Sequence, residues 1–174
     1  MRILIAEDDQ DISESYKDAL EARNHTVTVA YNGDECLSKY AKELKRWEKH
    51  KGRRDRRRPP FDAVILDYVM PRKDGLQVAK QILGMSPQQR IIFASAYVEK
   101  TLEDSVKQLK QVVELMQKPF GAEALVKTVE DKEIYEGLKQ IMVSIKDIKN
   151  TDPSPQQLRS LFEGLRNIQK GRTF

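Results

Sequence analysis

The hydrophobic positions of the chain form short apolar runs separated by longer stretches of helical periodicity. Apolar runs of this length, bounded by polar or turn-forming residues, are typical of buried strands. They cover residues 2–6, 25–30, 63–67, 90–95 and 112–116. Elsewhere apolar residues recur every three or four positions, which predicts amphipathic helices. These helices are expected over residues 11–23, 34–47, 76–83 and 101–110, with another from about residue 122.

Strands that alternate with helices predict a parallel sheet built from βαβ units. Strands that are apolar throughout fit a sheet covered by helices on both faces. With right-handed crossovers, the fold class is α/β, a flavodoxin-like, doubly wound, five-stranded parallel sheet in the order 2-1-3-4-5. Ligands of such sheets bind at the carboxyl ends of the strands, where the first and third strands flank the reversal of strand order.

Four of the five predicted strands end in residues whose chemistry is complementary. Glu7 and Asp8 follow the first strand, Asp67 ends the third, Ser95 ends the fourth and Lys118 follows the fifth. Three carboxylates brought together repel one another unless a cation neutralises them. Hard oxygen ligands in an open cleft suit Mg²⁺, and a lysine and a hydroxyl can hold phosphoryl oxygens. The set predicts phosphoryl transfer onto a carboxylate.

Each of these residues, taken alone, could simply end a strand or cap a helix; the combination makes that interpretation improbable. A phosphatase with an aspartyl nucleophile is a second alternative. Such enzymes commonly carry a second acid two residues after the nucleophile, and Val69 occupies that position. No glycine-rich loop with Lys-Ser/Thr is present, which argues against a P-loop nucleotide hydrolase.

The chain resembles the receiver domain of two-component response regulators over residues 1 to about 130. Five ordered motifs carry the resemblance: residues 3–9 (ILIAEDD), 63–71 (AVILDYVMP), 74–75 (DG), 95–96 (SA) and 118–120 (KPF). The resemblance implies a protein that catalyses only its own phosphorylation and slow dephosphorylation, without turnover of a substrate. It implies a histidine kinase or phosphotransfer protein as the donor and Mg²⁺ as the cofactor.

The resemblance also assigns roles to individual residues. It makes Asp67 the phosphoacceptor, with Glu7, Asp8 and the backbone carbonyl of Val69 completing the metal site. It makes Ser95 the switch hydroxyl, Ala96 the small residue beside the phosphate, Lys118 the phosphate-binding lysine, and Lys118–Pro119 a cis peptide bond. Asp9 is the ambiguous acid, because it could cap the following helix instead.

One position departs from the family pattern. The family usually places an aromatic switch residue three positions before the lysine, and this chain has Leu115 there. Tyr97, two residues after Ser95, is the nearest aromatic. The usual coupling, in which a ring swings inward as the hydroxyl moves, is therefore in question.

Charge is concentrated in one block. Residues 42–58 hold ten basic and three acidic side chains, a net charge of +7 within a chain of net charge +4, which leaves −3 for the rest. The block forms an insertion over residues 42–60. Such a run can bind nucleic acid or another acidic partner, and phosphorylation could control that binding. A solvated loop is the favoured interpretation, and nucleic-acid binding is kept as the alternative function.

Residues 131–174 form the second predicted unit. Apolar side chains recur at spacings of three and four over 134–148 and again over 158–168, with a Pro-containing break between them. This predicts a C-terminal helical hairpin extension. Its apolar stripes either fold back onto the receiver surface or form a homodimer or partner surface, which the heptad spacing slightly favours. No helix-turn-helix pattern with a basic recognition helix is visible.

Composition is consistent with a cytoplasmic location. Cys36 is the one cysteine of the chain, so an internal disulfide is excluded and a reducing compartment is expected. No apolar run reaches the length of a membrane span, and the first residues enter a strand pattern without a signal peptide.

Overall fold

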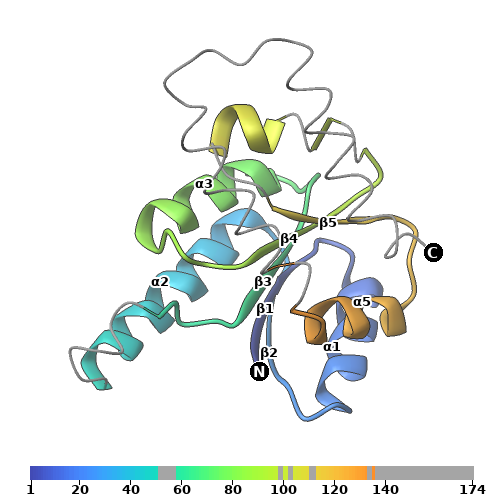
Figure 1. The fold of residues 1–174 in the computed structure, drawn as a ribbon, viewed down its shortest axis with the longest axis horizontal. Coiled ribbons are helices and arrows are strands. Elements are labelled where there is room, and N and C mark those ends of the chain that lie inside the picture. The colour runs from blue at the N-terminus through green and yellow to red at the C-terminus, as the bar shows by residue number, and fades with distance from the viewer. Residues whose placement is uncertain (51–57, 98–99, 102–103, 110–112, 133–134, 136–174) are drawn as a thin grey trace.

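A computed structural model describes residues 1–50, 58–97, 100–101, 104–109, 113–132 and 135 of the chain. Its five strands form one parallel sheet in the order β2-β1-β3-β4-β5, which confirms the predicted fold class (Figure 1). The strands are β1 (Arg2–Ala6), β2 (Thr26–Ala30), β3 (Ala63–Asp67), β4 (Ile91–Ser95) and β5 (Glu114–Gln117). The helices are α1 (Gln10–Glu21), α2 (Gly33–His50), α3 (Gly75–Met85), the π-helix η1 (Ser105–Leu109) and α5 (Ala122–Glu130).

Alternate side chains of the strands enter two separate cores. Along β1, Ile3 and Ile5 pack in the core that includes α1 and α5, whereas Leu4 and Ala6 pack in the core that includes α2 and α3. Figure 1 shows these two helix pairs on opposite sides of the sheet. Burial on both faces explains why β1, β3 and β4 lack a polar alternation. Cys36 lies completely buried in the core that includes α2 and α3.

Aspartates start two of the helices. The carboxylate of Asp9 accepts a hydrogen bond from the Ile12 N–H at 3.1 Å. Asp74 accepts one from the Gln77 N–H at 2.7 Å, at the start of α3. Each bond satisfies an N–H that has no partner within the helix. Asp9 is therefore the cap of α1, and the two acids before it remain for the edge of the sheet.

The stretch over residues 101–110 differs from the expected ordinary helix. Its described part contains η1, in which hydrogen bonds join residues five apart. Apolar residues three and four apart gather on one side of either kind of helix, so their spacing could not distinguish the two. Two other bounds shift: β5 begins at Glu114, and α2 continues to His50, inside the basic block. The predicted hairpin over 131–174 lies almost entirely outside the described residues.

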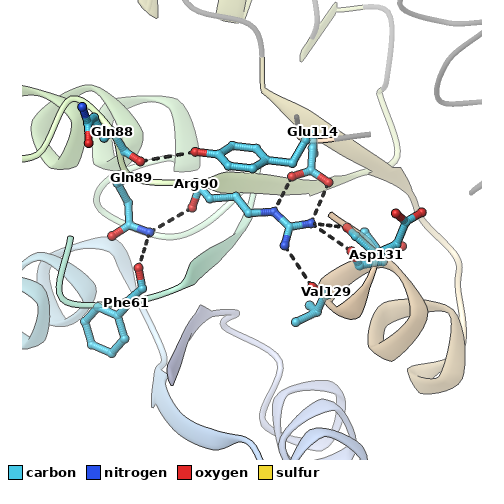
Figure 2. A network of polar contacts seen from close by, with 9 residues as sticks. Phe61, Gln88, Gln89, Arg90, Glu114, Val129 and Asp131 are labelled. Carbon is cyan, nitrogen blue, oxygen red and sulfur yellow. Dashed lines mark hydrogen bonds and ion pairs between the residues drawn. The ribbon is translucent and has the colours of Figure 1, made fainter. Parts of the chain in front are cut away.

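A buried ion pair fixes the end of the molecule opposite the carboxyl edge. Arg90, directly before β4, forms two hydrogen bonds with Glu114 at 2.6 and 3.0 Å, and both side chains are buried (Figure 2). The guanidinium also donates to the carbonyl oxygens of Thr128, Val129 and Asp131. Because these are the last carbonyls of α5, the arginine both pairs a buried carboxylate and caps a helix. The pair sets where α5 ends against the sheet.

Candidate functional site

Three carboxylates meet at the carboxyl edge of the sheet. Glu7 and Asp8 follow β1, and Asp67 is the last residue of the neighbouring strand β3. One oxygen of each lies within 4.8 Å of the others, close enough to hold one metal ion. Glu7 and Asp67 are buried and Asp8 is exposed, so the cluster is accessible from solvent on the side of Asp8.

The backbone around β3 fixes Asp67. Its Cα pairs in register with that of Ala94 on β4, and its Oδ1 accepts a hydrogen bond from the Val69 N–H at 3.3 Å. Gly75, the first residue of α3, lies directly against this strand end. A Cβ at Gly75 would stand only 2.3 Å from the carbonyl oxygen of Asp67. The close approach of α3 to the acid therefore requires a residue without a side chain.

Lys118 bridges two of the carboxylates. Its Nζ lies 2.7 Å from Glu7 Oε2 and 3.1 Å from Asp67 Oδ2. The lysine follows β5, and its backbone N–H donates to the carbonyl of Ser95 at 2.9 Å, which ties it to β4. The Lys118–Pro119 peptide bond is cis, as the resemblance implied. The site therefore brings together residues that follow or end β1, β3, β4 and β5.

Burial and charge act against each other in this cluster. Burial raises the pKa of Glu7 to about 7, and the charge of Asp67 adds to the rise, although the hydrogen bond from Lys118 opposes it. Burial by itself lowers the pKa of Lys118, but the hydrogen bond to Glu7 and the charge of Asp67 outweigh it and raise that pKa overall. The lysine therefore stays protonated, and the Glu7 carboxyl gains or loses its proton near neutral pH.

The hydroxyl of Ser95 belongs to a small hydrogen-bonded loop. Ser95 is buried, and its Oγ accepts from the Tyr97 N–H at 2.9 Å and from Thr101 Oγ1 at 2.9 Å. Ala96, the next residue, is exposed. Thr101 is a site residue that the sequence pattern did not reveal, because a hydroxyl in a predicted helix is ordinarily solvated or bonded to its own backbone.

Residues 3–130 match the family model described as the response regulator receiver domain. The chain belongs to this family. The match covers most of the chain, and it ends at the last residue of α5.

Curated relatives of this receiver are response regulators. The chain is 27% identical over 129 residues to the response regulator receiver protein CpdR of Brucella abortus, covering 74% of this chain and 93% of that protein. It is 32% identical over 96 residues to the response regulator MprA of Mycobacterium tuberculosis. That alignment covers 55% of this chain and spans only 35% of MprA, about a third of its length.

Solved receiver structures share the fold. The response regulator TrrA of Thermotoga maritima, solved in complex with Mg²⁺ and BeF, is 28% identical with a TM-score of 0.56, covering 74% of this chain and 96% of TrrA. A receiver domain protein of Clostridium thermocellum has a TM-score of 0.60 at 20% identity, covering 79% of this chain and 97% of that one. The second likeness concerns the fold alone.

Leu115 and Tyr97, the two residues considered for the modified switch position, lie in opposite surroundings. Leu115 is 3% exposed and pairs in register with Phe93 in the core beneath α2 and α3. Tyr97 is 63% exposed. The position at which the resemblance calls for an aromatic is thus filled by a packed aliphatic side chain, and the nearest aromatic lies at the surface.

A second unpredicted contact lies next to Asp67. The hydroxyl of Tyr68 donates to the carboxylate of Asp104, and its ring meets Phe93 edge-on, with centroids 6.0 Å apart. Tyr68 is mostly buried, and burial together with Asp104 raises the pKa of its hydroxyl. The residue after the central acid is therefore tied to Asp104, directly before η1.

Most of the described part of the basic block lies on α2; exposed Arg58 follows it in the chain outside that helix. Lys42, Lys45, Arg46 and Lys49 are exposed on this helix, whereas residues 51–57 lie outside the described residues. Lysines and arginines on a solvated helix face are ordinary for a soluble domain, so this part of the block singles out no partner. None of the helices in the described part of the chain combines the length and apolar character that a membrane span requires.

Proposed function

We propose that this receiver is a phosphorylation-dependent signalling switch in which Asp67 accepts a phosphoryl group from the phosphohistidine of a histidine kinase or phosphotransfer protein. The observation that supports this most directly is the position of Lys118 Nζ, 3.1 Å from Asp67 Oδ2, beside three carboxylates that can hold one ion. A fixed cation beside one carboxylate of an acidic cluster is suited to neutralising a phosphoryl group on that carboxylate.

The proposed step is one displacement at phosphorus. An oxygen of the Asp67 carboxylate attacks the phosphorus, an O–P bond forms, and the N–P bond of the donor breaks. The electron pair of that bond leaves with the imidazole nitrogen, which then takes a proton from solvent. Asp67 attacks as the carboxylate, and the Lys118 ammonium lies 3.1 Å from its Oδ2.

The other residues of the edge bind and orient the transferred group. Lys118 neutralises one phosphoryl oxygen, the Ser95 hydroxyl donates a hydrogen bond to another, and exposed Ala96 leaves space beside them. Glu7, Asp8, Asp67 and the carbonyl of Val69 would hold Mg²⁺, for which a set of carboxylate and carbonyl oxygens is well suited. When bound, Mg²⁺ would supply positive charge opposite the phosphoryl oxygens.

The proposal extends to the setting of the protein. It acts as a switch and not as a turnover enzyme, and its only chemistry is phosphorylation and slow dephosphorylation of its own Asp67. A kinase donor and a single reduced thiol, Cys36, fit the cytoplasm. A homodimer through the C-terminal helices stays a prediction, since those helices lie outside the described residues.

The test is chemical phosphorylation of the purified chain. Incubation with a small phosphoramidate and Mg²⁺ should add one phosphoryl group, detected by intact mass and lost on exposure to hydroxylamine, as expected of an acyl phosphate. Asp67→Asn should abolish the addition. Asp11→Asn, which changes an exposed acid in the first turn of α1, should leave it intact.

Three outcomes would contradict the proposal. Wild-type protein that stays unmodified under these conditions would show that the edge does not accept phosphoryl groups. Modification that persists in Asp67→Asn would place the acceptor elsewhere. Steady hydrolysis of a phosphomonoester by the wild type would instead favour the aspartyl phosphatase alternative.

A further inference from the structure

The hydroxyl of Ser95 has two hydrogen-bond donors in this structure, and neither of them belongs to the acidic cluster. The Tyr97 N–H and the Thr101 hydroxyl both lie 2.9 Å from Ser95 Oγ. Ser95 is 1% exposed and Thr101 is 0% exposed, so water does not compete for these bonds. A serine hydroxyl oxygen accepts two hydrogen bonds and has one hydrogen to donate.

The hydrogen of the Thr101 hydroxyl has two acceptors within reach. Thr101 Oγ1 lies 2.8 Å from the Tyr97 carbonyl oxygen and 2.9 Å from Ser95 Oγ. The carbonyl also accepts the backbone N–H of Thr101 at 2.9 Å, so it keeps a donor when the Thr101 hydrogen turns to Ser95. With the Tyr97 N–H and Thr101 both donating, the acceptor positions of Ser95 Oγ are filled and its own hydrogen is left for a third partner.

We propose that Thr101 is a positioning residue, which holds the Ser95 hydroxyl as a hydrogen-bond donor to the phosphoryl group on Asp67. Donation from Thr101 polarises the Ser95 hydroxyl and strengthens its own donation. It also restricts the rotation of that hydroxyl, so less entropy is lost when the phosphoryl oxygen is bound. This inference rests on the proposed function, since it concerns how Asp67, once modified, is recognised.

The same bond gives the receiver a polar connection that does not need an aromatic residue at position 115. Thr101 precedes η1, and Tyr68 reaches the same region through Asp104. If a phosphoryl group on Asp67 strengthens the Ser95–Thr101 hydrogen bond, it would therefore stabilise the chain that leads into η1. Because such coupling is reciprocal, a partner that stabilises the same part of the chain would favour the phosphorylated state of Asp67 by an equal free energy.

The experiment measures the affinity of the full chain for beryllofluoride, a phosphoryl mimic, at saturating Mg²⁺. Thr101→Val keeps the volume and removes the hydroxyl, and should weaken beryllofluoride binding by about fivefold to tenfold, the usual effect of one hydrogen bond. Thr101→Ser keeps the hydroxyl and should bind nearly as well as the wild type. Affinity for Mg²⁺ alone should be unchanged in both, because Glu7, Asp8 and Asp67 are untouched.

A double-mutant cycle separates positioning from general destabilisation. In the Ser95→Ala background, Thr101→Val should cost no further affinity, because the hydroxyl that it positions is gone. Thr101→Ala replaces the valine variant in the cycle if thermal unfolding shows that the valine variant does not fold. If the role of Thr101 were purely structural, Thr101→Val would lower stability in both backgrounds. It would then weaken beryllofluoride binding by the same factor with and without Ser95.

The outcomes distinguish this inference from the function on which it rests. Wild-type protein that fails to bind beryllofluoride with Mg²⁺ contradicts the proposed function itself. Wild-type binding together with equally tight binding by Thr101→Val overturns the role of Thr101 and leaves the proposed function standing. Equal losses from Thr101→Val with and without Ser95 overturn the role of Thr101 as well.

Discussion

The ammonium group of Lys118 lies 2.7 Å from Glu7 Oε2, at the carboxyl edge of the sheet. The pair is partly buried, so the lysine offsets a carboxylate that solvent cannot fully stabilise. The same ammonium group also reaches Asp67. A cation that binds the acids would therefore compete with the lysine for Glu7, and a phosphoryl group would compete with Glu7 for the lysine.

Binding of Mg²⁺ should depend on pH through Glu7. Its pKa is raised to about 7, so a metal ion that uses this carboxylate must displace a proton below that pH. We expect the affinity for Mg²⁺ to rise about tenfold between about pH 6 and pH 8, as the proton is lost. Titration calorimetry at several pH values measures this directly.

The matched variants for this titration are Glu7→Gln and Asp11→Asn. Glutamine has no proton to lose in this range, so the variant should bind Mg²⁺ more weakly and with little dependence on pH. Asp11→Asn, at an exposed position of α1, should retain the wild-type profile. An equally steep pH profile in Glu7→Gln would show that another group controls metal binding.

Gly75→Ala should damage the site through the backbone. The added Cβ would stand 2.3 Å from the Asp67 carbonyl oxygen, so β3 or the start of α3 must move. We expect a loss of about 1–3 kcal/mol in the free energy of unfolding, together with slower phosphorylation of Asp67. Chemical denaturation and the phosphoramidate assay measure the two effects.

Gly84→Ala is the matched control in the same helix. It lies near the end of α3, and a Cβ there meets nothing within 4 Å. Alanine is the better helix former, so stability should stay the same or rise by up to about 1 kcal/mol. Equal stability and equal phosphorylation in both alanine variants would contradict the close approach of α3 to Asp67.

The edge of the sheet could be predicted from the sequence because it depends on strand ends alone. Apolar runs locate the strands, parallel pairing brings their carboxyl ends together, and the acids and Lys118 follow directly. Contacts between side chains of different loops depend on the path of the backbone, which periodicity does not encode. This is why Thr101 beside Ser95, and Tyr68 beside Asp104, could be found only in the structure.

The Arg90–Glu114 pair was hidden for a different reason. Arg90 begins one predicted strand and Glu114 lies within another; charged side chains are ordinarily solvated, yet both are buried. Their burial follows from α5, whose last turn covers them and supplies carbonyl oxygens to the guanidinium. The spacing of apolar residues in α5 predicts which face of the helix is buried, but it does not predict which strand residues lie under the end of the helix.

Removing Arg90 should strongly destabilise the receiver. In Arg90→Met, the carboxylate of Glu114 would remain buried and lose both hydrogen bonds from the guanidinium, a change that typically costs about 3–5 kcal/mol. The carbonyls at the end of α5 would also lose a donor. We expect a large fall in the midpoint of denaturant unfolding. Arg90→Met with Glu114→Leu should recover part of the loss, because no buried charge is left.

The exposed pair between Arg23 and Glu130 provides the comparison. Its atoms approach to 2.8 Å, close to the distances in the buried pair, but Arg23 is largely exposed. Arg23→Gln should therefore leave the unfolding midpoint nearly unchanged, because solvent screens such pairs. Similar losses in Arg23→Gln and Arg90→Met would show that burial is not what makes the Arg90 pair important.

Tyr68→Phe should loosen the segment that contains η1 while preserving the core. The phenylalanine ring can still meet Phe93 edge-on, but the bond to Asp104 is lost. We expect a loss of about 1 kcal/mol in the free energy of unfolding and faster amide hydrogen exchange over residues 104–109. Tyr97→Phe, at an exposed position, should change neither. Unaltered exchange in Tyr68→Phe would show that Asp104 does not tether this segment. Faster exchange would show that a residue adjacent to Asp67 controls the order of the segment, a connection that bypasses the aliphatic side chain of Leu115.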